Sequence, residues 1–452
     1  MALLPDLDMT KVLVYHNLDD STDVGGKTQS LDLAEYYAAA RGIPVGNLRG
    51  IHLQDVTSNA QYPGTPEQFA EILSSIKADV ETAEADAVIL SSRCPLGIES
   101  TLLYPPVSDP FYYYSFSQCI RHLFQPPSKY RKPIWQMTSQ DSLNLGLIRG
   151  YSKGVTNVYR PHTPYAYTGA VKQLLVGHLG CHPFRTDLHN RNKEIIDEAV
   201  LAESTGGIPV TAPATIYYAI YGGDTFPVQN EVPAIEALRE KYTLKLGWPT
   251  SSNAAMSALG YSTPDFLLTR STQALLDTDG ICNINPAGND TEVLCTAAGG
   301  TWYSLGSLAR IDAGDTGAQS AEAELDPTLG TTFTNVSAFL GNWYRNRAYI
   351  DLFDWMPGSI AWVGTSFGFY FGWGALEHGA CCFAGSLAEP IWNPGISGDA
   401  WWVKPKYTGF RMVELATLAS NMWQDCIAGD PLYRAVHVRD PIGSSGGYVL
   451  RH

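Results

Sequence analysis

Short apolar runs alternate with amphipathic stretches over the first ninety residues. The runs at 12–15, 50–53 and 87–90 are typical of buried parallel strands. Between them, residues 30–41 and 65–76 predict helices. The second of these opens with a Thr-Pro-Glu-Gln capping box and then repeats apolar residues at helical spacing. This alternation predicts a parallel sheet with right-handed crossovers.

The same alternation returns later in the chain. A strand at 174–176 precedes a helix at 192–203 and another strand at 216–221. Near the C-terminus, a strand at 360–363 comes before a helix at 410–423, whose apolar residues share one face. We therefore expect an α/β fold with a mainly parallel sheet flanked by helices. We also expect the N-terminal strands and the strand at 360–363 to lie in one sheet.

Two stretches interrupt this pattern and indicate how the chain is divided. Residues 101–170 are rich in aromatic residues and proline; their Tyr and Trp side chains could stack on sugars or anchor a protein partner. A satellite core under long loops is the alternative. Residues 223–335 are rich in Thr, Ser, Asn, Ala and Gly and only weakly periodic. We predict a first core half at 1–222, an irregular insertion lobe at 223–335 and a second core half at 336–452.

Composition narrows the function classes. The 452 residues carry a formal net charge of −15, which argues against a nucleic-acid-binding protein because phosphate binding needs clustered Lys and Arg. The chain has no run of roughly 18 apolar residues that would span a membrane. Its start, Met1-Ala-Leu-Leu-Pro-Asp6, lacks the basic segment and the long apolar run of a signal peptide. A cytoplasmic protein, or one that leaves the cell by assembly into a particle, fits this start.

Two of the eight cysteines are placed to form a disulfide. Cys282 and Cys295 flank one short polar loop, and Gly299-Gly-Thr-Trp302 follows. This arrangement resembles cysteine-stapled segments of tailed-phage virion proteins and bacterial surface proteins. A disulfide here would imply an oxidising exterior. The other six cysteines show no CxxC spacing and are expected to be buried free thiols.

The loop around Gly280 has side chains that a calcium ion prefers. Oxygen-bearing side chains recur on both sides of this glycine. An EF-hand loop would end in a bidentate acid, but the corresponding position is Gly288, so a plain Asx-turn loop is the alternative. Calcium is the one cofactor that the sequence suggests. The candidate ligands are Asp277, Asp279, Asn283 and Asn285.

A series of short motifs runs through the chain in a fixed order. They include Val12-Leu-Val-Tyr-His-Asn17, Ala34-Glu-Tyr-Tyr-Ala-Ala-Ala-Arg-Gly-Ile-Pro44, Leu90-Ser-Ser-Arg-Cys-Pro-Leu96, Leu174-Leu-Val-Gly-His-Leu179, Gly341-Asn-Trp-Tyr344, Pro357-Gly-Ser-Ile-Ala361 and Gly429-Asp-Pro-Leu-Tyr433. Together they resemble one family of large bacterial proteins, often predicted to be exported. That family has a caspase/gingipain-like α/β domain and no assigned activity. The resemblance therefore implies a fold and little chemistry.

In caspase-like peptidases a His and a Cys sit at the ends of neighbouring strands, and the thiolate attacks the carbonyl carbon. The strand at 360–363 could occupy the nucleophile position, but Gly-Thr-Ser-Phe follows it and no cysteine does. Ser366 is the alternative nucleophile, with His16 or His378 as its base, although His378 has the pattern of a helix C-terminal residue. We expect no competent catalytic pair here.

Three histidines gather near Cys181. On a helix, His178 and His182 would lie on one face, as in many zinc sites. A glycine and a proline in the same stretch oppose a helix, so we expect loop and strand-end histidines. His189 follows in the same region.

Two functions from different classes fit these observations. We favour a structural or binding component of a virion or cell-surface assembly, whose caspase-like domain lacks a catalytic pair. Such a protein would contact protein partners, including copies of itself, and could bind glycans through Tyr and Trp. The alternative is a hydrolase, a peptidase or esterase, with Ser366 or a cysteine as nucleophile. A virion or extracellular location is preferred, and the cytoplasm is the alternative.

Overall fold

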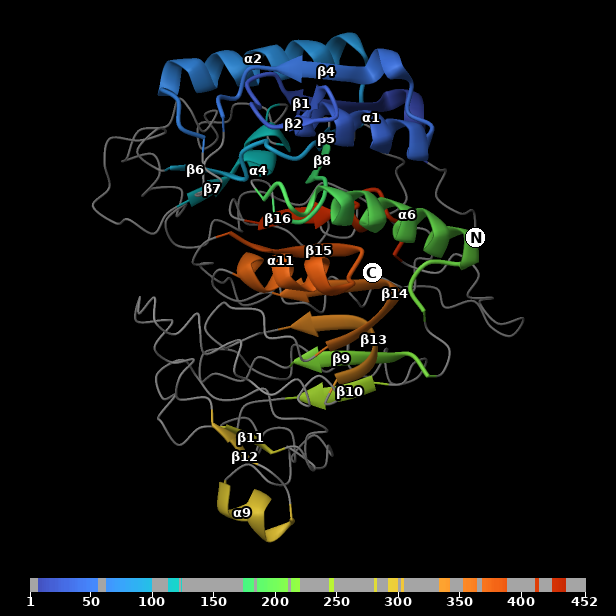
Figure 1. Ribbon diagram of the computed structural model, residues 1–452. Coiled ribbons are helices and arrows are strands. Elements are labelled where there is room, and N and C mark those ends of the chain that lie inside the picture. The colour runs from blue at the N-terminus through green and yellow to red at the C-terminus, as the bar shows by residue number, and fades with distance from the viewer. Residues whose placement is uncertain are drawn as a thin grey trace, which may run out of the picture.

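Two sheets form the centre of the molecule, one above the other in Figure 1. The computed structural model describes residues 7–55, 62–99, 113–121, 123, 174–182, 185–209, 213–219, 244–247, 280–282, 292–299, 302–304, 333–341, 353–363, 368–387, 411–413 and 425–435. The expected α/β class, with parallel strands flanked by helices, is confirmed.

The first sheet is fully parallel and is built from the N-terminal strands. β1 (Val12–Asn17) lies between β4 (Leu48–Ile51) and β5 (Ala87–Leu90), and β8 (Leu175–His178) pairs with β5. All four residues of β5 are buried. Helices cover both faces of the sheet, which explains why these strands are continuous apolar runs in the sequence.

Helices α1 (Gln29–Arg41) and α2 (Pro66–Thr82) pack on opposite faces of β1. The Thr28 hydroxyl caps the start of α1, and Gly42 ends it in the left-handed region at φ 67°. The predicted capping box of α2 is confirmed, because the Thr65 and Gln68 side chains each accept from the other's backbone N–H.

The second sheet contains strands from later parts of the chain. Its order is β10-β9-β13-β14-β15-β16, and every pair is parallel except β15 with β16. Helix α11 (Phe369–His378) packs on β13 and β14, where the Phe371 ring lies 5.2 Å from that of Phe339 and 5.5 Å from that of Phe353. The strands are β9 (Thr215–Ala219), β10 (Leu244–Gly247), β13 (Phe333–Gly341), β14 (Phe353–Val363), β15 (Cys382–Ser386) and β16 (Asp425–Gly429).

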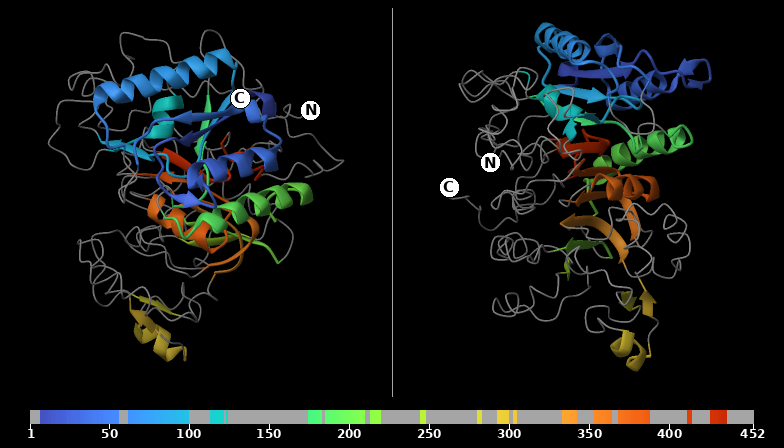
Figure 2. Two further views of the ribbon diagram at one scale, coloured as in Figure 1. Left: turned by 45° about the horizontal axis from the view of Figure 1, so that its top comes forward. Right: turned by 90° about the vertical axis from the view of Figure 1, so that its left-hand side faces the viewer.

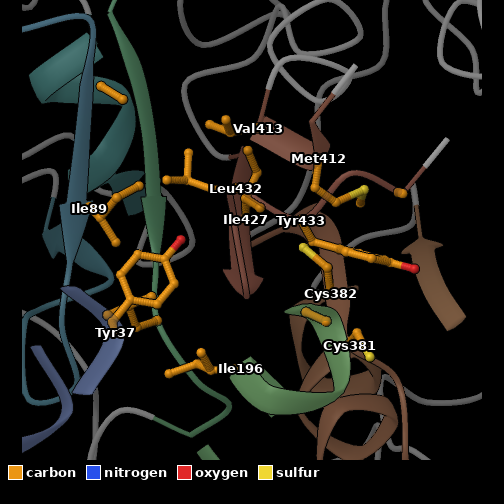
Figure 3. Close-up of a cluster of buried hydrophobic side chains, with 14 of the residues drawn as sticks. Tyr37, Ile89, Ile196, Cys381, Cys382, Met412, Val413, Ile427, Leu432 and Tyr433 are labelled. Atoms are coloured by element: carbon orange, nitrogen blue, oxygen red, sulfur yellow. The ribbon is translucent and has the colours of Figure 1, made fainter. Parts of the chain in front are cut away.

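The two sheets meet where β8 approaches β16. Gly180 and Gly429 exchange backbone hydrogen bonds of 2.9 and 2.8 Å across this junction. Helix α6 (His189–Thr205) packs beside α1, which covers the first sheet, and it also contacts β14 of the second sheet. Apolar side chains from both sheets and from the C-terminal segment fill the space between them (Figure 3).

Smaller elements complete the described part of the chain. The β11–β12 hairpin and α9 lie at the opposite end of the molecule from α2 (Figures 1 and 2). These smaller elements are η1 (Met9–Lys11), β2 (Asp23–Val24), β3 (Lys27–Thr28), η2 (Val45–Asn47), β6 (Gly97–Glu99), β7 (Tyr113–Ser115), α4 (Phe116–Arg121), β11 (Gly280–Cys282), α9 (Glu292–Ala297) and β12 (Trp302–Ser304).

One expectation about the sheets is wrong. The strand at 360–363 is the end of β14 and belongs to the second sheet, whereas the strands at 12–15 and 87–90 belong to the first. The antiparallel strand β16 lies between the two parallel sets and separates them. Within the stretch 223–335, β10 joins the second sheet at its edge, next to β9.

Candidate functional site

The carboxyl ends of β1, β4 and β5 meet at one edge of the first sheet, and Asn17 ties together the loops that leave them. Its buried side-chain amide donates to the carbonyls of Gln54 and Arg93, at 2.7 and 2.9 Å. Its carbonyl accepts from the backbone N–H groups of Asp19 and Leu53, at 3.0 and 3.2 Å. Open α/β sheets bind ligands outside the carboxyl ends of their strands. We therefore take this edge as the candidate functional site in the described part of the chain.

Two residues of this edge have left-handed backbone conformations. Gln54 has φ 59° and Arg93 has φ 64°, values that are uncommon for residues other than glycine. Asn17 binds the carbonyl oxygen of both. Such conformations concentrate at functional sites and persist where the surrounding structure fixes them. Asn17 therefore holds the loops in an arrangement that isolated loops would rarely adopt.

Opposite charges are paired beneath this surface. The Arg93 guanidinium lies 3.3 Å from the Asp20 carboxylate and 2.5 Å from that of Asp55. Asp20 also accepts the backbone N–H of Ser30, at 2.8 Å, in the first turn of α1. The side chains of Asp20 and Arg93 therefore stabilise the edge itself, because their polar atoms contact the protein.

Asp19 and His52 form a second, exposed pair on the same edge. The Asp19 Oδ1 atom lies 2.8 Å from His52 Nδ1, and Asp19 Oδ2 accepts the Gln54 N–H at 2.7 Å. Partial burial raises the pKa of Asp19, but the hydrogen bonds from His52 and Gln54 outweigh it and the pKa lies below its usual value. A carboxylate at Nδ1 favours the tautomer whose Nε2 can accept a proton. The His52 side chain is 77% exposed, which leaves its ring open to solvent.

Sequence reasoning missed this pair because the apolar pattern placed His52 inside a strand. The strand ends one residue earlier, at Ile51, so His52 begins the loop. The signal was available in the polar residues that directly follow the apolar runs of parallel strands.

The six free cysteines that the structure describes are buried and are poor nucleophiles. Burial raises the pKa of Cys181 to about 12, and its thiol lies 3.0 Å from the Asn192 carbonyl oxygen. Burial also raises the pKa of Cys381 and Cys382, the two thiols near His378 in sequence. A protonated, buried thiol neither attacks a carbonyl nor binds a metal readily. The free thiols are Cys94, Cys119, Cys181, Cys381, Cys382 and Cys426.

The structure places two of the three alternative catalytic residues, and they lie far apart in the fold. His16 lies on β1, and burial lowers its pKa. His378 is the last residue of α11, where its Nδ1 lies 2.8 Å from the carbonyl oxygen of Gly374. Ser366 lies outside the described residues. Strands β5, β8, β16 and β15 lie between β1 and β14, the strand that precedes Ser366.

The histidines near Cys181 occupy separate environments. His178 ends β8 and is buried, and burial lowers its pKa to about 3. His182 lies against Trp373, with ring centroids 4.1 Å apart and the ring planes tilted by 42°, and His189 Nε2 lies 2.7 Å from Asp32. Among the described residues, no group of three or more His, Cys, Asp or Glu is placed to hold a metal ion.

Several predicted sites fall on residues that the structure does not describe. The candidate calcium ligands Asp277, Asp279, Asn283 and Asn285 and most of the aromatic stretch at 101–170 lie outside the described ranges. The backbone positions of Cys282 and Cys295 are described: β11 ends at Cys282, and α9, which contains Cys295, lies against this strand. Their disulfide stays a prediction.

Comparison with known proteins gives one distant likeness. No protein-family model matches the sequence, and no curated protein matches it significantly. Among solved structures, the chain is similar to one described as "Structure of Protease", at 10% sequence identity and a TM-score of 0.38. The likeness covers 94% of this chain and 78% of that chain. None of the helices in the described part of this chain combines the length and apolar character needed to cross a membrane.

Proposed function

We propose that this protein is a structural or binding component of a virion or cell-surface assembly, and that its caspase-like domain does not work as a cysteine peptidase. The observation that carries the proposal is the burial of all six described free thiols. A cysteine peptidase needs an accessible thiol of lowered pKa, whereas burial raises the pKa of the thiols near His378.

The contacts that the motif residues make in the fold support the same proposal. Tyr37, Arg41 and Asp430, from two motifs far apart in the chain, contact one another in the buried junction between the sheets. Glu203 also binds Arg41, at 2.7 Å. These residues stabilise the fold by mutual contact. A structural or binding role needs no reactive group among them.

Analytical ultracentrifugation of the purified full chain tests the proposal, together with a panel of chromogenic ester and peptide substrates. We expect a defined multi-copy species and no turnover above buffer. A stable monomer that hydrolyses any of these substrates would contradict the proposal. The Cys381→Ser variant is the matched control, because it leaves a thiol-independent activity unchanged.

A hydrolase that uses Ser366 is the second candidate. It is favoured by one observation: β13 and β14 are neighbouring parallel strands, so their carboxyl ends, Gly341 and Val363, lie at the same edge of the second sheet. Caspase-like peptidases carry their catalytic pair at such neighbouring ends. A fluorophosphonate probe should then label the wild-type chain and not the Ser366→Ala variant. Equal labelling of both proteins would exclude Ser366 as the nucleophile.

A further inference from the structure

Residues 429–435, here called the clasp, run between the two sheets and contact both. On the first-sheet side, Gly429 exchanges backbone hydrogen bonds with Gly180. On the second-sheet side, the Asp430 N–H donates to the carbonyl of Cys381 at 2.9 Å, and the Tyr433 hydroxyl donates to that of Gly358 at 2.7 Å. The clasp is therefore shared by the two halves.

The Asp430 carboxylate is the centre of these contacts and is fully buried. It accepts the Tyr37 hydroxyl at 2.9 Å and the Arg41 Nε–H at 3.0 Å, both from α1. Inside the clasp it accepts the Leu432 N–H at 3.1 Å. Arg41 also binds Glu203 of α6, whose other oxygen accepts the Arg434 N–H at 2.6 Å. One buried carboxylate thus joins α1, and through Arg41 also α6, to the clasp.

Two further segments donate backbone hydrogen bonds to the clasp, and the Arg411 guanidinium of one of them also donates to the Leu432 carbonyl at 2.6 Å. The Met412 N–H donates to the Tyr433 carbonyl at 2.7 Å, and the Val413 N–H donates to that of Pro431 at 2.8 Å. The Ile208 N–H, just after α6, donates to the carbonyl of Ala435 at 2.9 Å. Figure 3 shows Met412, Val413, Leu432 and Tyr433 in the cluster between the sheets.

Apart from the Cys382–Gly429 pair at the end of the β15–β16 ladder, the hydrogen bonds within each sheet do not involve the clasp. β1 pairs with β4 and β5 along four residues each, and β14 pairs with β15 along four. In the described residues, the backbone connection between the sheets is the single bridge of Gly180 with Gly429. Proteins can open one cooperative unit of the fold at a lower free energy than global unfolding.

We propose that the clasp is a releasable lock between the two sheets, which opens as a unit while the ladders within each sheet stay closed. Asp430 holds the lock shut through its contacts with Tyr37 and Arg41. When the clasp opens, the apolar surface shown in Figure 3 becomes accessible, and the two sheets are free to change their relative position.

Hydrogen exchange measured by mass spectrometry on the full chain tests this proposal. The Tyr37→Phe variant removes one donor to Asp430 and keeps the ring. The matched control is Tyr36→Phe, because the neighbouring Tyr36 hydroxyl binds Asp197 on α6 at 2.7 Å and does not touch the clasp.

We expect Tyr37→Phe to raise exchange about tenfold at the amides that the clasp protects, since a hydrogen bond to a charged group contributes more than a neutral one. These amides belong to Gly180, Ile208, Met412, Val413, Gly429 and Asp430. The amides of β1, β5, β14 and β15 should keep their wild-type exchange rates. Tyr36→Phe should leave the exchange rates of the clasp amides unchanged.

Two results would overturn the proposal. One is an equal rise in the amide exchange rates of β1, β5, β14 and β15, which would mean that the clasp opens only by global unfolding. The other is clasp exchange in Tyr37→Phe no faster than in Tyr36→Phe. If Tyr37→Phe does not fold, Arg41→Lys provides the second test, because it keeps the charge and loses the fixed Nε–H donor to Asp430.

Discussion

The hydroxyl of Tyr37 donates to the buried carboxylate of Asp430 at 2.9 Å, across 393 positions of the sequence. Both side chains are almost completely excluded from solvent. The Arg41 guanidinium neutralises this carboxylate from the same helix, one turn further on. A buried charge remains stable only when it is paired and hydrogen-bonded, so these three side chains depend on one another.

Replacing Asp430 should destabilise the protein strongly. Asp430→Ala leaves the Arg41 charge without its buried partner, and we expect a loss of about 3–5 kcal/mol in the free energy of unfolding. Urea denaturation followed by circular dichroism measures it. Asp197→Ala, which removes the exposed partner of Tyr36, should cost less than about 1 kcal/mol. Equal losses in the two variants would show that burial of the charge is not the cause.

Asn17 should be essential to the edge of the first sheet. Asn17→Ala removes both donors and the acceptor that hold three loops, and we expect a loss of about 2–4 kcal/mol. The backbone at Gln54 and Arg93 should then lose its fixed conformation, visible as faster amide exchange in both loops. Asn190→Ala, at an exposed position of α6, is the control and should change stability by less than about 0.5 kcal/mol. A mild effect at Asn17 would mean that water replaces its hydrogen bonds.

His178 should make the protein less stable as the pH falls. Burial lowers its pKa in the folded chain to about 3, whereas in the unfolded chain it keeps the ordinary value near 6.5. Between these two values the unfolded chain binds the extra proton, so stability decreases with falling pH by up to about 1.4 kcal/mol per pH unit.

Urea denaturation of wild type and His178→Leu between pH 4 and pH 7 checks this sign. The variant should lose less stability over that range than the wild type. Asn190→Ala, a change at an exposed position that removes no titratable group, should follow the wild-type slope. Parallel slopes for wild type and His178→Leu would show that His178 is protonated equally in both states.

The six described free thiols should resist modification in the folded protein. Iodoacetamide at pH 8 should leave Cys94, Cys119 and Cys381 unlabelled over hours, because burial excludes the reagent and raises the pKa of each thiol. Peptide mapping after denaturation should find all three labelled. Rapid native labelling at any of them would show that the surrounding core opens readily.

Cys282 and Cys295 should behave differently from the other cysteines. If they form the predicted disulfide, both become labelled only after reduction, and a non-reducing peptide map should contain them in one linked pair. In the chain-entropy estimate such a short loop contributes roughly 2–3 kcal/mol. Recovery of either residue as a free thiol before reduction would refute the pairing.

Local signals in the sequence predicted the helices and strands of the first sheet well. The capping residues Thr28 and Thr65 and the glycine at 42 mark helix ends whose hydrogen bonds are formed by near neighbours. The second sheet was harder to predict. β13 lies in a stretch rich in Thr and Ser at the end of the predicted insertion, and β16 is only five residues long. Neither has a periodic pattern long enough to distinguish it from a loop.

The candidate site and the junction could be predicted only in part, for a different reason. Asn17 and Asp430 both belong to motifs that stand out in the sequence. Their partners come from loops and helices that folding brings together, such as Arg93 for the first and Tyr37 for the second. No spacing along the chain encodes such contacts, so the motif is visible in the sequence while its role is not.

The position of β16 at the edge of the second sheet, next to β8, has a consequence for synthesis. The strand that approaches β8 in the finished protein, β16, begins at Asp425, late in the chain. A ribosome that adds roughly 5–20 residues per second needs about 12–50 seconds to produce the intervening part of the chain. During that time β8 is an uncovered edge of a parallel sheet, open to pairing with other chains. The nascent protein therefore passes through an interval of aggregation risk, in which a chaperone that shields β8 would raise the yield of native protein.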